Sequence, residues 1–307
     1  MSTQSLPEAV CVHCGQRFNA AHCIYTVRPA SLSADVSAAF VQLQRDDAAT
    51  GFLLQCAGRT SSARYAQSVA ASALRTTLSL TDANGIIGRG GMHCLSEGQA
   101  LQLLRPGEPH CQRGTLLDVG AGDGSVTAHL APLFQRVFAT EVSAPMLRRL
   151  RSRPGFGVLD SADVSREALD AAAQVTDVGP LPADGFDCVA LLNVLDRCDA
   201  PRTLLLRLRQ LMKPVDGRLL LAVVLPFRPF VEEGTQRRPP RESLGLSSTA
   251  SFEASLDALW QTVLQPLGFR LHAVSRVPYM SDGDEKSPVY VLDDAILVLS
   301  LSPAERG

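Results

Sequence analysis

Short runs of aliphatic residues, bounded by Gly, Asp and Pro, recur along the second two-thirds of the chain. Such runs are typical of strands that are buried on both faces of a parallel sheet. The pattern predicts seven strands, in the runs TLLDVGAG, RVFATEV, FGVLD, FDCVALLNVL, RLLLAVVLPF, RLHAVSRVPY and YVLDDAILVLSL.

Helical spacing fills most of the gaps between these runs, for example around residues 144–151 and 201–212. Alternating strands and helices predict an α/β fold whose mainly parallel sheet has helices on both faces. Only a short loop around Gly283 and Pro288 separates the last two runs, so they are expected to pair as an antiparallel hairpin at one edge. A reversed last strand is typical of the Rossmann-like class I methyltransferase fold. We therefore expect a seven-stranded, mostly parallel sheet with an antiparallel last strand.

The first part of the chain has a different pattern. Residues 1–80 are rich in Ala, Ser and Gln and are expected to form an N-terminal helical arm or cap before a catalytic domain at residues 81–307. The apolar positions that suit amphipathic helices are Val36, Phe40, Val41, Leu43, Val69, Ala73 and Leu74. Two stretches of the domain, residues 162–185 and 232–251, are expected to be surface loops.

Composition and charge narrow the class of protein. Of 307 residues, 46% are apolar and 20% charged, which excludes collagen-like and disordered chains. The net charge of −2 comes from scattered residues, so no surface for nucleic acid or an anionic membrane is expected. No apolar run is long enough to span a bilayer, and MSTQSLPEAV does not resemble a signal peptide. We expect a soluble, cytoplasmic or otherwise intracellular protein.

The eight cysteines are mostly isolated, as Cys56, Cys94, Cys111, Cys188 and Cys198 are, so reduced thiols are expected. One group, at Cys11, His13, Cys14, His22 and Cys23, contains residue types that can bind zinc. A second, correctly spaced pair of ligands is missing. The sequence favours a loose polar segment there, and no metal is expected.

The sharpest local signal is a glycine loop at residues 118–124, Asp-Val-Gly-Ala-Gly-Asp-Gly, directly after the first strand. Its third glycine comes one position too early for the dinucleotide pattern G-x-G-x-x-G. An acid beside such a loop would repel a pyrophosphate but attracts an ammonium and a sulfonium group. The loop therefore favours S-adenosylmethionine over NAD, with Asp118, Gly120 and Gly122 as candidate contacts.

Further acids follow the next two strands. Glu141 stands about 20 residues after the glycines, where a carboxylate can accept hydrogen bonds from both ribose hydroxyls. After the third strand, Asp160 and Asp163 are candidates for the adenine amino group, and Asp163 is the one we select. Either acid could instead cap the following turn.

The segment after the fourth strand, NVLDRCD at residues 193–199, is expected to place the methyl acceptor. Enzymes that methylate adenine or glutamine amino groups have two prolines and an aromatic residue there, whereas this chain has Val194, Leu195 and Asp196. A carboxylate suits an imidazole, because it can accept the hydrogen bond of the protonated ring nitrogen. Alternatively, Asp196 caps the next helix or pairs with Arg197.

Seven segments, in matching order from about Leu80 to Leu299, resemble the DREV family of methyltransferases. They are NGIIGRGGM, LLDVGAGDGSVT, ATEVSAPM, NVLDRCD, LPFRPFVEE, VPYMSDGD and YVLDDAILVL. The glycine loop is generic, whereas NGIIGRGGM, NVLDRCD and YVLDD are specific. The resemblance implies protein-histidine N-pros (π) methylation of His-x-His segments with a small middle residue.

Carried over residue by residue, the resemblance places the family's cofactor contacts on Asp118, Gly120, Glu141, Asn193 and Tyr279. It places the contact with the substrate imidazole on Asp196. For the substrate site we add Phe227, Arg228 and Arg89. Arg89 could clamp the cofactor carboxylate, close over the site or be an exposed turn residue.

Three features depart from the family pattern. The apolar, secretory-pathway-like segment of animal members is absent, so their endomembrane location is in doubt. Residues 162–185 form a longer segment than expected, and Arg228 and Phe230 replace the expected His and Tyr. Two alternatives stay open: a methyltransferase acting on a small-molecule nitrogen or oxygen, and a cofactor-binding interaction protein without catalysis.

Overall fold

The strands predicted from the hydrophobic runs all belong to one sheet. A computed structural model describes residues 6–104 and 114–302, so Cys111 lies outside the described residues. The strands are β4 (Thr115–Val119), β5 (Arg136–Thr140), β6 (Phe156–Leu159), β7 (Cys188–Leu192), β8 (Arg218–Val224), β11 (Phe269–Asp282) and β12 (Val289–Leu301). The prediction of these seven strands is confirmed.

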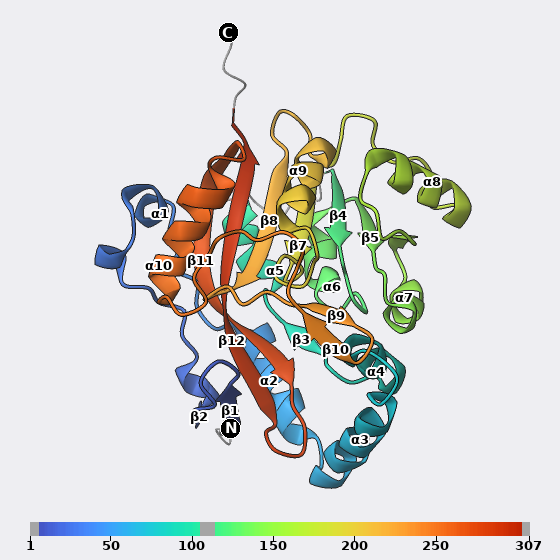
Figure 1. The fold of residues 1–307 in the computed structure, drawn as a ribbon, viewed down its shortest axis with the longest axis vertical. Coiled ribbons are helices and arrows are strands. Elements are labelled where there is room, and N and C mark those ends of the chain that lie inside the picture. The colour runs from blue at the N-terminus through green and yellow to red at the C-terminus, as the bar shows by residue number, and fades with distance from the viewer. Residues whose placement is uncertain (1–5, 105–113, 303–307) are drawn as a thin grey trace.

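The order across the sheet is β6-β5-β4-β7-β8-β12-β11 (Figure 1). The first five strands run parallel to one another. β12 runs antiparallel to β8 and β11: Ile296 pairs with Ala222 of β8 on one side and with Ser275 of β11 on the other. The expected hairpin and reversed last strand are confirmed, and the fold is that of a Rossmann-like class I methyltransferase.

Short strands that the sequence does not predict extend this sheet. β1 (Glu8–Cys11) pairs in parallel with the beginning of β12, and β2 (Arg17–Asn19) pairs with β1. β3 (Met92–His93) pairs with β11. The beginning of the described chain is therefore hydrogen-bonded to the sheet.

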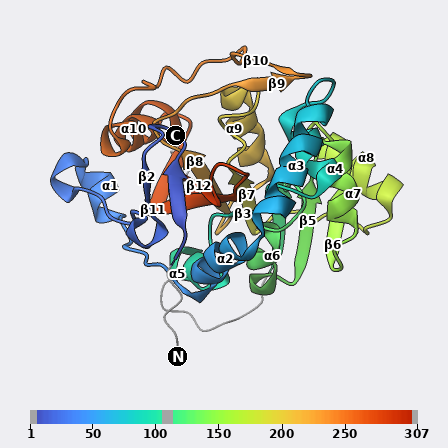
Figure 2. The same cartoon turned by 90° about the horizontal axis from the view of Figure 1, so that it is seen from below.

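Helices cover both faces of the sheet (Figures 1 and 2). They are α1 (Ala34–Ala38), α2 (Asp47–Gly58), α3 (Ser61–Leu74), α4 (Leu80–Ile87), α5 (Glu97–Leu104), α6 (Thr127–Leu130), α7 (Ala144–Arg151), α8 (Arg166–Thr176), α9 (Pro201–Leu211) and α10 (Phe252–Ala258). The helices predicted at residues 144–151 and 201–212 correspond to α7 and α9. Within the described residues, every helix is too short or too polar to cross a membrane.

The core is divided by the sheet. Successive side chains of a strand point to opposite faces, so Leu116 and Leu117 of β4 join different clusters. The Leu117 cluster includes buried residues of α8, α9 and α10, and the Leu116 cluster includes those of α5 and α6. This two-sided burial explains why the strands read as continuous aliphatic runs.

The expectation of a surface loop at residues 162–185 is wrong, because this segment contains α8. The hydroxyl of Ser165 caps the helix by accepting a hydrogen bond from the Ala168 N–H. Leu169, Ala172 and Ala173 are buried on one face of it. Their i, i+3, i+4 spacing is that of one helix face, and the sequence analysis overlooked it.

Two further expectations need correction. Residues 232–251 are mostly irregular, but they contribute to a hairpin of β9 (Val231–Glu233) and β10 (Gln236–Arg238). The helix expected to include Phe40, Val41 and Leu43 ends at Ala38. The Val41 N–H instead donates to the Val274 carbonyl at 2.8 Å, because this segment lies along the free edge of β11.

Candidate active site

The glycine loop joins the carboxyl end of β4 to α6. The Gly120 N–H donates to the Thr140 carbonyl at 3.1 Å, which ties the loop to β5. Gly120 has a φ of +75°, and a Cβ there would lie 2.7 Å from Val194 Cγ2. The glycine therefore lets the loop contact the segment that follows β7.

Gly122 has a φ of +60°, and a Cβ added there would meet no atom within 4 Å. Unlike Gly120, it faces open space. The loop thus offers bare backbone to a ligand at Gly122, which suits the close approach of a cofactor.

Asp118 lies in β4 and is buried. Its Oδ2 accepts a hydrogen bond of 2.6 Å from the Thr127 hydroxyl in α6. Burial raises the pKa of Asp118 to about 6, and the nearby charge of Glu141 acts in the same direction. The side chain connects the strand to the helix beneath the glycine loop.

Glu141 follows β5 and is 7% exposed. Its Oε2 accepts the Gly122 N–H at 2.8 Å, and its Oε1 accepts the N–H groups of Val142 and Ser143 at 2.8 and 2.7 Å. A carboxylate oxygen can accept two hydrogen bonds, so Oε2 retains one position for a further donor. The structure thus brings Glu141 against the glycine loop.

Helix α4, which lies outside the sheet, helps to hold Glu141 in place. The Ser143 hydroxyl donates to Asp82 Oδ1 at 2.6 Å. Gly85 brings α4 close to α7, because a Cβ there would lie 2.8 Å from Pro145 Cβ. Asp82 therefore holds the turn whose backbone N–H groups bind Glu141.

The two acids after β6 lie at the surface. Asp163 has a side chain 50% exposed, and its Oδ1 accepts hydrogen bonds from the Ser165 N–H at 2.9 Å and from Arg207 at 2.6 Å. The Ser165 N–H lowers the pKa of Asp163. Asp160 pairs with Arg151 at 3.0 Å. Asp163 thus makes the turn contact of the alternative interpretation, whereas Asp160 makes a surface ion pair.

The acceptor segment begins at Asn193, directly after β7. Asn193 has a φ of +59°, which an asparagine tolerates better than most residues. Its side-chain Nδ2 donates to Asp294 Oδ2 at 2.8 Å. Its Oδ1 is buried and has no hydrogen-bond partner.

Asp196 is only 2% exposed. Its Oδ2 pairs with Arg197 at 2.5 Å, while its Oδ1 is buried without a partner. Burial raises the pKa of Asp196 to about 6, against the lowering effect of Arg197. Pairing with Arg197, which the sequence left open, thus occupies one oxygen and leaves the other available.

Asp294 of β12 belongs to the same region, and the sequence analysis missed it. It is completely buried and accepts hydrogen bonds from Asn193 and from the Cys94 thiol at 3.5 Å. Two acids in the middle of the aliphatic run YVLDDAILVL were the available signal. Tyr279 of β11 is near by, with its hydroxyl against the sulfur of Met92, and burial raises the pKa of that hydroxyl.

The remaining predicted substrate residues are more scattered. Phe227 is buried in the core cluster that contains Leu117. Arg228 is exposed, and its Nε donates to the Ser248 carbonyl at 3.1 Å. Arg89 pairs with Asp284, in the loop between β11 and β12, at 3.5 Å.

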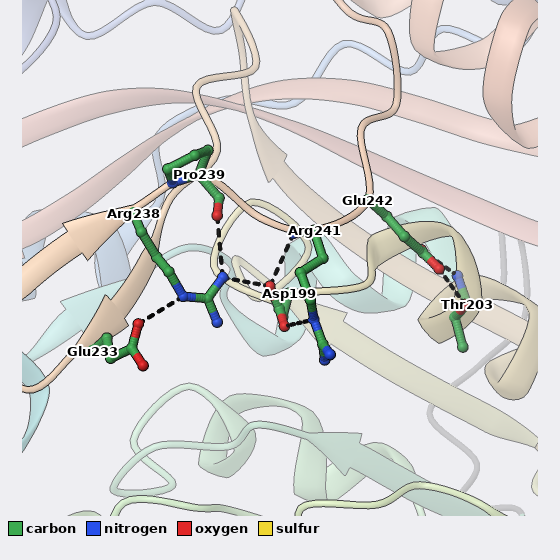
Figure 3. A network of polar contacts seen from close by, with 7 residues as sticks. All are labelled: Asp199, Thr203, Glu233, Arg238, Pro239, Arg241 and Glu242. Atoms are coloured by element: carbon green, nitrogen blue, oxygen red, sulfur yellow. Dashed lines mark hydrogen bonds and ion pairs between the residues drawn. The ribbon is translucent and has the colours of Figure 1, made fainter.

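The chain from Glu233 to Glu242 is fixed against Asp199, at the end of the acceptor segment, and against Thr203 (Figure 3). Asp199 pairs with Arg238 at 2.6 Å and with Arg241, and these arginines lower its pKa. Glu242 accepts hydrogen bonds from Thr203 at the start of α9. Nearer the site, the Phe230 N–H donates to the Asp196 carbonyl at 3.0 Å.

The guanidinium groups of Arg197 and Arg237 each lie 4.0 Å from the centre of the Phe230 ring. Such stacking favours a fixed arginine orientation. Phe230 thereby holds the arginine that pairs with Asp196.

The cysteine and histidine group near the N-terminus does not assemble a metal site. Within the two described stretches, no three His, Cys, Asp or Glu side chains are placed to hold a metal ion. Cys14 is exposed at the turn after β1, whereas Cys23 is partly buried.

A family model described as DREV methyltransferase matches residues 25–301. The chain belongs to the DREV methyltransferase family. This confirms the resemblance found in the sequence. The strand order of the sheet agrees with this membership, because it is the order of a class I methyltransferase fold.

Curated relatives are similar over part of the chain. Uncharacterized methyltransferases of Mycobacterium bovis and Mycobacterium tuberculosis are 33% identical over 111 residues, which is 36% of this DREV chain and 51% of each relative. The chain spans about half the length of the curated relatives it matches.

Solved structures are similar at low identity. A SAM-dependent methyltransferase from Aquifex aeolicus is 18% identical, with a TM-score of 0.38 over 66% of this chain and 88% of that chain. The YcgJ protein from Bacillus subtilis is 11% identical, with a TM-score of 0.42 over 68% and 98% of the two chains.

Proposed function

We propose that the protein transfers a methyl group from S-adenosylmethionine to the pros nitrogen of histidine in His-x-His segments. The observation that carries this proposal is the Asp196 carboxyl, which is buried at the carboxyl end of β7 with one oxygen free. It lies in the segment that contacts the glycine loop through Val194 and Gly120.

The residues present fit the cofactor. Asn193 Oδ1 is a buried acceptor without a donor, Gly122 faces open space, and Glu141 Oε2 has room for one more donor. Acceptors of this kind suit the ribose hydroxyls and the α-ammonium group. When bound, S-adenosylmethionine supplies a methyl group on a positively charged sulfonium.

On the acceptor side, Asp196 Oδ1 is the oxygen that accepts the tele N–H of the substrate imidazole. This hydrogen bond selects the tautomer whose pros nitrogen carries the lone pair. The pros nitrogen takes the methyl group as the bond from carbon to sulfur breaks, which leaves S-adenosylhomocysteine. The tele proton then leaves to Asp196 or to water. The chain contributes mainly positioning and exclusion of water, since a neutral imidazole needs no prior deprotonation.

Arg197 keeps the Asp196 carboxylate in place, and Phe230 keeps Arg197 in place. We keep the exposed Arg228 as a proposed contact with the rest of a peptide and the partly buried Tyr279 as a proposed cofactor contact. The proposed partners are proteins or peptides that contain His-x-His.

The test is mass spectrometry of a His-x-His peptide incubated with the protein and S-adenosylmethionine. Hydrolysis and chromatography against pros- and tele-methylhistidine standards identify the nitrogen. The expected product is pros-methylhistidine, and a peptide with both histidines replaced by alanine is the control. Transfer to a small molecule alone would favour that class of acceptor, whereas cofactor binding without any transfer would favour a non-catalytic binding protein.

A further inference from the structure

The environment of Asp294 suggests a role that the proposed reaction does not assign. Asp294 lies in the middle of β12, paired with Val224 of β8 and Val277 of β11, and its side chain is completely buried. Such a carboxylate is costly to charge unless a cation or several strong donors compensate it.

The donors to Asp294 are uncharged. The Asn193 amide and the Cys94 thiol both donate to Oδ2, and Oδ1 is buried without a partner. The cations in this region are committed elsewhere, since Arg197 pairs with Asp196 and Arg276 pairs with Asp293 at 2.9 Å.

Two of the other titratable groups near Asp294 oppose its ionisation. Asp196, from the segment after β7, and Asp293, its neighbour on β12, are acids. Cys94 and the Tyr279 hydroxyl, from β11, are neutral in their ordinary state. Negative charge on Asp196 and Asp293 disfavours a further charge on Asp294, because like charges repel.

We propose that Asp294 is a positioning residue that stays protonated at neutral pH and fixes the Asn193 side chain with its oxygen toward the bound ligands. Because Oδ2 accepts two hydrogen bonds, the proton resides on Oδ1. With Nδ2 of Asn193 committed to Asp294, Oδ1 of Asn193 presents an acceptor. The inference rests on the proposed function only for the identity of those ligands.

A neutral Asp294 also leaves Asp196 as the ionised member of the pair. Burial raises the pKa of Asp294 to about 8 and that of Asp196 to about 6. As pH rises, Asp196 therefore loses its proton before Asp294 does. The protein thus keeps an acceptor oxygen on Asp196 without placing two negative charges in one buried site.

The first test measures melting temperature from pH 5 to pH 9 for the wild-type protein, Asp294→Asn and Asp293→Asn, with no cofactor or substrate. A buried acid with a raised pKa binds more protons in the folded than in the unfolded state, so its contribution to stability is lost as pH rises toward the folded pKa. Between pH 5 and pH 9, the melting temperature of the wild-type protein should therefore fall by about 5 °C or more beyond the fall of Asp294→Asn.

Asp293→Asn is the matched control, because Asp293 is paired with Arg276 and partly exposed. The melting temperature of Asp293→Asn should fall with rising pH as much as that of the wild-type protein. An equal pH dependence in wild-type and Asp294→Asn protein would overturn the proposal. If Asp294→Asn fails to fold, NMR titration of wild-type protein labelled at the aspartate carboxyl carbon decides the point, since one carboxyl must titrate above pH 7.

The second test measures methylation of the His-x-His peptide and calorimetric affinity for S-adenosylhomocysteine at pH 7. Asparagine replaces a protonated carboxyl with a similar shape, so both quantities should stay within about threefold of wild type. Asp294→Ala should weaken affinity at least fivefold, because Asn193 loses its partner. A hundredfold loss of turnover in Asp294→Asn with normal affinity would mean that the charged form is needed. If no peptide is methylated, the melting test still decides the state of Asp294.

Discussion

One oxygen of the Asp196 carboxyl group is held by an ion pair, while the other can still accept a hydrogen bond. Arg197 occupies Oδ2, and Oδ1 is buried without a hydrogen-bond partner. In Asp196→Asn, the amide can turn an N–H toward the imidazole and favour the wrong tautomer. We expect turnover on the His-x-His peptide to fall by about 10²–10⁴, with affinity for S-adenosylhomocysteine within a few fold of wild type.

Steady-state kinetics and calorimetry on the same preparation test this separation. Asp170→Asn, an exposed acid on α8 paired with Arg166, is the control and should change neither quantity. Near-normal turnover in Asp196→Asn would leave Asp196 only as the partner of Arg197. Methylation of the tele nitrogen by wild-type protein would contradict the assigned tautomer.

The positions of residues that follow the end of a strand could be predicted from the sequence. Glu141, Asn193 and Asp196 follow strands whose carboxyl ends meet at one edge, and the structure places them there. Asp294 could not be found in this way. Whether an acid in mid-strand is buried depends on the strands beside it, and only the pairing of β12 between β8 and β11 encloses Asp294.

At the scale of elements, α4 is coupled to the cofactor region through the Asp82–Ser143 hydrogen bond. Asp82→Ala removes the acceptor and frees the turn that binds Glu141. Hydrogen bonds to charged groups contribute about 1.5–3 kcal/mol, so affinity for S-adenosylhomocysteine should fall roughly tenfold. Calorimetry measures this change.

Asp82→Asn is the matched variant, because its amide oxygen can still accept from Ser143. Its affinity should remain near that of the wild-type protein. Equal losses in the two variants would show that the charge of Asp82, and not its hydrogen bond, matters.

Long apolar runs identified the main strands correctly because both faces of the sheet are covered. The short strands β1, β2, β3, β9 and β10 carry two to four residues each and no periodic pattern. Their conformation depends on the partner strand. Helix α8 was missed for a related reason, since only three of its apolar residues face the core.

For the whole molecule, the acids around the glycine loop predict selective stabilisation by one class of cofactor. S-adenosylhomocysteine at 100 times its dissociation constant adds about 2.7 kcal/mol to the free energy of unfolding. This corresponds to a rise of several degrees in melting temperature for a chain of this size. NAD at the same concentration should give no rise, because its pyrophosphate meets Asp118 and Glu141.

Gly122→Asn serves as the control for the location of the site. Asparagine tolerates a positive φ, and its side chain would occupy the open space above the loop. The variant should melt close to the wild-type temperature but lose the rise with S-adenosylhomocysteine. A full rise in this variant would place the cofactor elsewhere.

The central position of β12 has a consequence for how the protein is made. This strand leaves the ribosome after the other described strands of the sheet, yet it fills the gap between β8 and β11 and brings in Asp294. Until then, β8 has an open edge and Asn193 lacks its partner. A nascent chain that stops short of residue 289 thus exposes an open, apolar sheet edge, which needs protection against aggregation until β12 has been made.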